Sequence, residues 1–358
     1  MSRFHPLRVA QVHQETRDTI VLGFAVPDAL QEAFRFVQGQ HLTLRATIGG
    51  EDTRRSYSIC SAVQDARLQV AIKRVADGVF SSWANDTLKA GDVIDVMPPM
   101  GHFHVPLAAG NRKHYLAFAV GSGITPLLSI IKTTLLSEPG SVFTLVYGNR
   151  ASSAVIFRDA LAELKDQYLT RFRLIYVMSR EQQDVDLFNG RITHDKCRQF
   201  FASWIDLGDI DTAFICGPQQ MMQDVSQALQ EGGLRTEQIK VELFAASAPR
   251  RAHVPGSMAV AGSQACAVTM IQDGVQVNFS MDKDRESVLD AALKLGIEMH
   301  YACKAGVCST CRCKVVEGRV DMDANHALED YEVARGFALA CQSFPVSDRL
   351  VLDFDQDH

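Results

Sequence analysis

The sequence predicts three domains: an antiparallel β-barrel, an α/β domain with a parallel sheet, and a small α+β domain. Short apolar runs divided by turn residues fill the first hundred positions, as in a barrel. Strands then alternate with helices up to residue 244, which indicates a parallel sheet. A hairpin signal, a short helix and a cysteine-rich loop follow. We expect domains at 1–108, 109–244 and 264–358, with a linker of small residues and prolines at 245–263.

The composition is that of an ordinary globular protein. Of 358 residues, 47% are hydrophobic and 22% are charged. The first residues lack the apolar stretch of a signal peptide, and nine unevenly spaced cysteines favour a reducing compartment and a metal site. We therefore expect a cytoplasmic protein. The uncharged segment 115–131 contains Gly-Ser-Gly-Ile-Thr-Pro and is short for a bilayer, so it predicts a buried strand, a turn and a helix.

The net charge of −6 is unevenly distributed. Residues 264–358 hold sixteen acidic and nine basic residues, whereas the preceding residues hold 26 acidic and 27 basic ones. The negative charge therefore lies on the last domain. This disfavours nucleic acid as a partner and suits attraction to a complementary protein surface, although a solvated acidic face would look the same.

In the first domain we expect strands at 19–24, 41–46, 68–73 and 93–96. Two motifs accompany them: Arg55-Ser56-Tyr57-Ser58, and Gly78 to Ser81 at the start of a helix over 80–88. An arginine fork binds pyrophosphate, and helix N–H groups bind phosphate. A flavin ring needs an aromatic face and a hydroxyl, for which Tyr57 and Ser58 are suited. Together the motifs predict a flavin site, although each alone also occurs in ordinary strands.

The second domain alternates strands with helices. We expect strands at 115–120, 142–147, 172–178, 212–215 and 239–244, and helices at 127–136, 157–165, after Thr193 and at 219–231. Ligands bind at the carboxyl ends of such strands. Gly121-Ser-Gly-Ile-Thr-Pro126 and Cys216-Gly217-Pro218 both follow strand ends, so this edge is predicted to face a nucleotide. Cys216 could equally be a packed small hydrophobic residue.

A third strand end predicts the nucleotide preference. Ser179 and Arg180 follow strand 172–178, and Arg191 follows the turn at Asn189-Gly190. These donors suit the 2′-phosphate of NADPH, although NADH is possible and Glu181 complicates the interpretation. A solvated surface arginine is the alternative.

The last domain contains a ligand pattern for iron. Cys303, Cys308, Cys311 and Cys341 have the C-x₄-C-x₂-C…C spacing of a [2Fe–2S] site, which leaves Cys313 as a spare. Asp273-Gly274 predicts a hairpin between strands 265–271 and 275–280, and a helix over 286–295 ends at Gly296. A zinc site usually uses paired C-x₂-C knuckles, and a disulfide framework suits small secreted domains, so both alternatives fit the pattern less well.

These motifs resemble the ferredoxin–NADP reductase superfamily with a plant-type ferredoxin domain fused behind it. The resemblance rests on Arg55-x-Tyr57-Ser58, Gly78-x-x-Ser81, Gly121 to Pro126, Cys216-Gly-Pro218 and the Glu242-Leu-Phe244 ending. The cluster loop and Ala-Leu-Glu-Asp-Tyr-Glu-Val-Ala-Arg-Gly resemble most of all the reductase subunits of phenylacetyl-CoA epoxidases.

The resemblance implies a β-grasp fold for the last domain and a path of electrons from NADPH through FAD and [2Fe–2S] to a di-iron oxygenase. It implies a hydride-transfer site of Ser58, Cys216 and Glu242, with Phe244 over the flavin ring, although Phe244 could also be a core residue. The cofactor-binding residues that it implies are Arg55, Ser56, Tyr57, Ser58, Ile72, Lys73, Gly78, Val79, Phe80, Ser81, Gly121, Gly123, Thr125, Pro126, Ser179, Arg180, Arg191, Cys216, Gly217 and Pro218.

Other functions remain open from the sequence. The oxygenase could be a different one, or the electron acceptor could be a desaturase or a hybrid-cluster protein. A zinc- or cluster-sensing module without turnover is a further alternative, against which the intact flavin and nucleotide motifs argue. We expect neither nucleic acid nor membrane as a partner.

Overall fold

In a computed structural model, residues 4–244, 265–283 and 285–356 are described. They form two compact units, one of residues 4–244 and one within residues 245–358. The predicted linker at 245–263 lies outside the described residues.

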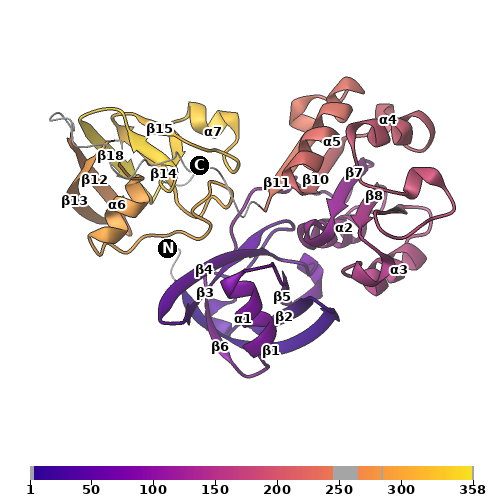
Figure 1. The fold of residues 1–358 in the computed structure, drawn as a ribbon, viewed down its shortest axis with the longest axis horizontal. Coiled ribbons are helices and arrows are strands. Elements are labelled where there is room, and N and C mark those ends of the chain that lie inside the picture. The colour runs from indigo at the N-terminus through magenta and orange to yellow at the C-terminus, as the bar shows by residue number, and fades with distance from the viewer. Residues whose placement is uncertain (1–3, 245–264, 284, 357–358) are drawn as a thin grey trace. The chain divides into compact units, whose positions relative to one another are not determined.

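The first part of unit 4–244 is a six-stranded antiparallel barrel sheet. Its strand order is β4-β3-β6-β1-β2-β5, and a bridge between Ile59 and Val70 joins the β4 and β5 ends of the sheet. The strands are β1 (His5–Thr16), β2 (Thr19–Ala25), β3 (His41–Ile48), β4 (Glu51–Ser58), β5 (Leu68–Lys73) and β6 (Val93–Val96), and helix α1 (Val79–Thr87) packs against them (Figure 1). Inward residues such as Leu7, Leu22 and Leu44 are fully buried, so alternation along the strands builds the core.

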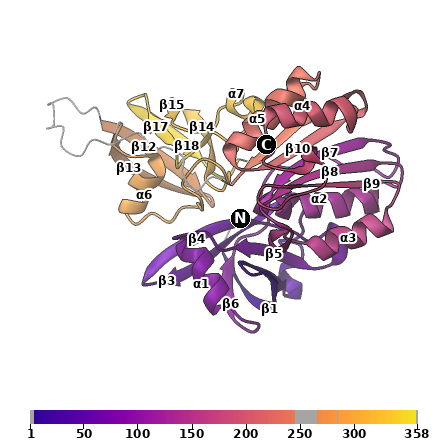
Figure 2. The same ribbon diagram turned by 45° about the vertical axis from the view of Figure 1, so that its right-hand side comes forward.

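The second part is a five-stranded parallel sheet with the order β11-β10-β7-β8-β9. Helices α4 and α5 cover one face, and α2 and α3 cover the other (Figure 2). The strands are β7 (His114–Val120), β8 (Val142–Asn149), β9 (Phe172–Met178), β10 (Thr212–Gly217) and β11 (Ile239–Leu243). The helices are α2 (Ile124–Ser137), α3 (Arg158–Gln167), α4 (His194–Ser203) and α5 (Gln219–Glu231).

The segment 115–131 divides as predicted into strand β7, a 3₁₀ turn at Gly121–Gly123 and helix α2. None of the helices in the described ranges is long and apolar enough to cross a membrane. Thr193 caps α4 by accepting the backbone N–H of Lys196, as its place before that helix suggested.

The second unit has a mixed sheet of order β13-β12-β18-β14-β16 and a two-stranded sheet of β15 and β17. Strands β12 and β18 are parallel, and the remaining pairs are antiparallel. The strands are β12 (Ala265–Gln272), β13 (Val275–Asp282), β14 (Arg312–Glu317), β15 (Val320–Met322), β16 (Phe337–Leu339), β17 (Ser343–Pro345) and β18 (Arg349–Asp353). Helices α6 (Val288–Lys294) and α7 (Asp330–Ala334) complete it.

The predicted hairpin is confirmed in its turn geometry. Asp273 and Gly274 have φ values of 52° and 72°, the left-handed pair that a two-residue turn between twisted strands requires.

Candidate functional site

Two strand-end turns pack closely at the carboxyl edge of the parallel sheet. Gly121 has φ of +57°, and a Cβ on Gly123 would lie 2.0 Å from the carbonyl oxygen of Cys216. Only glycine at position 123 therefore lets the turn after β7 reach the end of β10. Thr125 is buried and donates its hydroxyl to the carbonyl of Ser122 at 3.0 Å, which shapes the first turn of α2.

A cavity of about 660 Å³ opens at this edge, a size typical of ligand pockets. Nine of the predicted site residues line it: Lys73, Gly121, Gly123, Ser179, Arg180, Arg191, Gly217, Pro218 and Phe244. Phe244 is 42% exposed, so its ring is not a core residue in unit 4–244. Thr125, Pro126 and Cys216 are buried and do not line the cavity.

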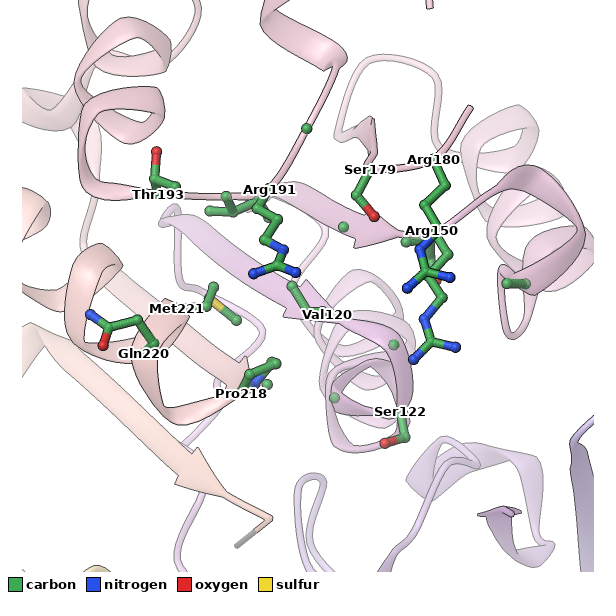
Figure 3. Close-up of a pocket in the computed structure, with 18 of the residues that line it drawn as sticks. Val120, Ser122, Arg150, Ser179, Arg180, Arg191, Thr193, Pro218, Gln220 and Met221 are labelled. Atoms are coloured by element: carbon green, nitrogen blue, oxygen red, sulfur yellow. The ribbon is translucent and has the colours of Figure 1, made fainter. Parts of the chain in front are cut away.

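Three arginines reach into this cavity from neighbouring segments (Figure 3). The backbone N–H of Arg180 donates to the carbonyl of Arg150 at 2.8 Å, and the N–H of Gly190, just before Arg191, donates to the carbonyl of Met178 at 2.7 Å. Arg150 follows β8 and was not predicted, although its place at a strand end on the same edge is a signal that could have identified it. None of the three guanidinium groups pairs with a carboxylate among the described residues. The cavity is therefore suited to an anion.

The carboxylate of Glu181 is held away from these cations. It accepts the backbone N–H of Ser152 at 2.8 Å and also the Ser152 hydroxyl. These hydrogen bonds lower the pKa of Glu181, so it is ionised but already engaged. The acidic Glu181 beside Arg180 therefore does not oppose the binding of an anion, because its carboxylate is already hydrogen-bonded to Ser152.

The predicted hydride-transfer residues converge beside the barrel. The hydroxyl of Ser58, at the end of β4, donates to the carboxylate of Glu242 in β11 at 3.1 Å. Cys216 pairs with Glu242 in the parallel register of β10 and β11. Three residues from three strands are thereby brought together, although they are separated by as many as 184 positions in the chain.

Burial changes the protonation of two of these groups. Burial raises the pKa of Glu242 to about 8, against which the Ser58 hydrogen bond acts. Burial, together with the nearby Glu242, raises the pKa of Cys216 well above that of a free thiol. The site therefore brings together a hydroxyl with a carboxyl and a thiol whose pKa values are both raised.

The residues of the barrel motifs suit a flavin nucleotide. Tyr57 lies 5.7 Å from Phe80 between ring centroids, and Arg55 is exposed at the surface of β4. Gly78 provides no side-chain cap for α1, so the first N–H groups of that nine-residue helix are open to a phosphate. Ser81 is buried and closes its own turn, because its hydroxyl accepts from Val75 N–H and donates to the Gly78 carbonyl. Ser56 contacts Thr43, and Ile72 is a core residue of β5.

The four predicted cluster cysteines gather in the second unit. Cys308, Cys311 and Cys341 are buried and Cys303 is partly exposed. The neighbouring cysteines influence one another's pKa values: Cys308 and Cys341 act on Cys303, and Cys341 acts on Cys311. The backbone N–H of Ala305 points at the Cys303 sulfur at 3.3 Å, and the side chain of Gln342 at the Cys341 sulfur at 3.7 Å. Such donors stabilise thiolates bound to iron.

This arrangement fits a binuclear cluster. A [2Fe–2S] cluster divides four thiolates into two pairs, one for each iron. Within 265–283 and 285–356, no three or more His, Cys, Asp or Glu side chains are grouped for a single metal ion. Cys313 lies in β14 with its sulfur 3.6 Å from the carbonyl oxygen of Ala338. That it is not a ligand stays a prediction.

Comparison with known families assigns all three regions. Residues 6–105 match the oxidoreductase FAD-binding domain, residues 118–227 the oxidoreductase NAD-binding domain, and residues 270–346 the 2Fe-2S iron-sulfur cluster binding domain. The chain is thus an oxidoreductase with FAD-, NAD- and [2Fe–2S]-binding domains.

Relatives match the chain over nearly its whole length. The chain is 46% identical over 355 residues to a subunit of the 1,2-phenylacetyl-CoA epoxidase of Escherichia coli (strain K12), covering 99% of both chains. It is 32% identical to the ferredoxin reductase component of 3-ketosteroid-9-alpha-monooxygenase of Rhodococcus rhodochrous, covering 99% of this chain and 97% of the relative. The structure of phthalate dioxygenase reductase is similar in fold, with a TM-score of 0.58, 22% identity and 98% of each chain covered.

Proposed function

The chain belongs to the family of flavin and iron–sulfur reductase components of oxygenases that includes this component of the 1,2-phenylacetyl-CoA epoxidase, and from this premise we propose its specific role. It passes electrons from NADPH through FAD and [2Fe–2S] to the oxygenase component of a phenylacetyl-CoA epoxidase. The observation that carries the proposal is the 46% identity over 99% of both chains. We assign the protein to the cytoplasm, because the five cysteines outside the predicted cluster set form no disulfide in the described ranges and a reducing compartment keeps them so.

Bound FAD supplies the step between a two-electron hydride donor and a cluster that accepts one electron at a time. The residues of this chain bind the flavin and orient it. Arg55 and the amino end of α1 would hold the flavin pyrophosphate, and Tyr57 would offer an aromatic face to its ring. Ser58 donates its hydroxyl to Glu242 in the structure, so this pair forms a polar contact at the reacting face without adding a charge there. Cys216 is buried beside Glu242 in the strand register, and Phe244 lines the cavity.

NADPH is the preferred nucleotide in this proposal. Three guanidinium groups without carboxylate partners in the described ranges and the Ser179 hydroxyl face one cavity, and a 2′-phosphate would neutralise that charge. NADH lacks the phosphate and would leave the cations unmatched. The engagement of Glu181 by Ser152 removes the acid that an NAD-preferring site would offer to a ribose hydroxyl.

The acidic cluster domain suits a basic docking surface on the oxygenase. Residues 264–358 hold sixteen acidic and nine basic residues, so attraction to a basic surface would speed association at low ionic strength.

Reconstitution tests the proposal. The full-length protein, loaded with FAD and iron, is combined with the purified oxygenase components of a phenylacetyl-CoA epoxidase or of a 3-ketosteroid-9-alpha-monooxygenase. We expect NADPH consumption coupled to epoxidation of phenylacetyl-CoA, and little coupled turnover with the steroid system. Coupled turnover with the steroid system alone would overturn the assignment of the acceptor.

A further inference from the structure

A buried ion pair lies beside the cluster loop. Arg312 stands between Cys311 and Cys313, and its Nη1 donates to Oε1 of Glu332 at 2.7 Å. The side chains of Arg312 and Glu332 are only 13% and 1% exposed. Ion pairs at such low exposure are little screened by water or salt, so both charges act strongly on their surroundings.

Both partners are fixed in place. The second oxygen of Glu332 accepts the backbone N–H of Glu329 at 3.0 Å, which places the carboxylate at the start of α7. The guanidinium of Arg312 lies 4.6 Å from the ring centroid of Phe337. Phe337 begins β16, which leads directly to Cys341, and the N–H of Ala340 donates to the carbonyl of Cys311 at 3.0 Å. The pair therefore lies between the chain segments of two cluster ligands.

We propose that Glu332 is a positioning residue that balances the Arg312 charge and so sets the reduction potential of the [2Fe–2S] cluster. With four thiolates, two sulfides and two ferric ions, the cluster carries a charge of −2, and one added electron makes it −3. A cation beside it favours the reduced form, and a carboxylate favours the oxidised form. In the intact pair, the opposite effects of the two charges on the reduction potential largely cancel. This inference rests on the cluster of the proposed function but not on the nucleotide or the oxygenase.

Removing one partner at a time gives opposite effects. Glu332→Gln keeps an amide of similar shape, which a helix-capping position tolerates, and removes the negative charge beside Arg312. Arg312→Gln leaves the carboxylate uncompensated. A unit charge about 10 Å away at an effective dielectric constant of about 20 changes the equilibrium constant for reduction roughly tenfold. For one electron this corresponds to about 59 mV, upward in Glu332→Gln and downward in Arg312→Gln.

The experiment is a redox titration of the full-length protein with a chemical reductant and mediators, in which the reduced cluster is followed by electron paramagnetic resonance. It needs neither NADPH nor an oxygenase. Asp330→Asn removes the same charge from an exposed position of α7 and should hardly shift the potential. Arg312→Lys should retain the wild-type potential, and the double variant Arg312→Gln/Glu332→Gln should return towards it.

Shifts of opposite sign that exceed that of Asp330→Asn support the proposal. Shifts of the same sign, shifts no larger than the control, or loss of iron from both single variants would overturn it, because the pair would then be only a structural tie. A wild-type protein without a cluster would instead contradict the proposed function.

Discussion

Arg180→Ala is the perturbation that most directly tests the nucleotide preference. Arg180 lines the cavity with Arg150 and Arg191, and none of the three pairs with a carboxylate in the described part of the chain. A hydrogen bond to a charged group contributes about 1.5–3 kcal/mol, which corresponds to roughly ten- to a hundredfold in kcat/KM. Arg180 is exposed and two cations remain, so we expect a loss of about tenfold for NADPH.

The assay is steady-state reduction of ferricyanide with NADPH and with NADH, on protein of equal flavin content. NADH turnover should barely change, since NADH has no 2′-phosphate. Arg173→Ala is the matched control, because Arg173 is exposed in the same strand β9 and does not line the cavity. Equal losses with both nucleotides, or a wild type that already prefers NADH, would refute the reasoning.

Three further predictions concern the other sites. Replacing Cys303, Cys308, Cys311 or Cys341 by Ser should remove the cluster, whereas Cys313→Ser should keep it. Iron content and the visible spectrum show whether the cluster is present. Loss of the cluster in Cys313→Ser and its retention in Cys311→Ser would contradict the ligand set. A chain ending near residue 248 should fold, keep FAD and reduce ferricyanide but not cytochrome c, because residues 4–244 form a unit of their own; an insoluble, flavin-free product would count against this. Because burial raises the pKa of Glu242 to about 8, its contribution to stability is greatest below the unfolded value near 4.5 and falls as pH rises to about 8. As pH rises across that range, the unfolding free energy of Glu242→Gln should therefore increase relative to that of the wild type, by at most about 1.4 kcal/mol per pH unit. Urea titrations at several pH values measure this difference, and a difference that does not depend on pH would show that Glu242 is not buried as a neutral acid.

Local signals in the sequence were sufficient for most elements. Strands 68–73, 93–96 and 172–178 were predicted with the bounds that the structure shows, because their apolar runs end at turn residues. Seven strands were not predicted: β1 and β4 in the barrel, and β14 to β18 after the cluster loop. β1 and β4 are largely polar, as in Glu51–Ser58, and become strands by pairing with apolar neighbours such as β3.

The sequence by itself determined the class of each domain, the cysteine spacing that predicts the cluster ligands, and the glycine turns. These depend on periodicity, spacing and backbone freedom over a few residues. Only the tertiary structure decided which distant side chains meet. The contact of Ser58 with Glu242, the inclusion of Arg150 in the cation cluster and the pairing of Arg312 with Glu332 all depend on strand order and register. A shift of one residue in the register of a strand moves all of its side chains to the opposite face of the sheet. The register is fixed by packing across the sheet, so no short stretch of sequence specifies it.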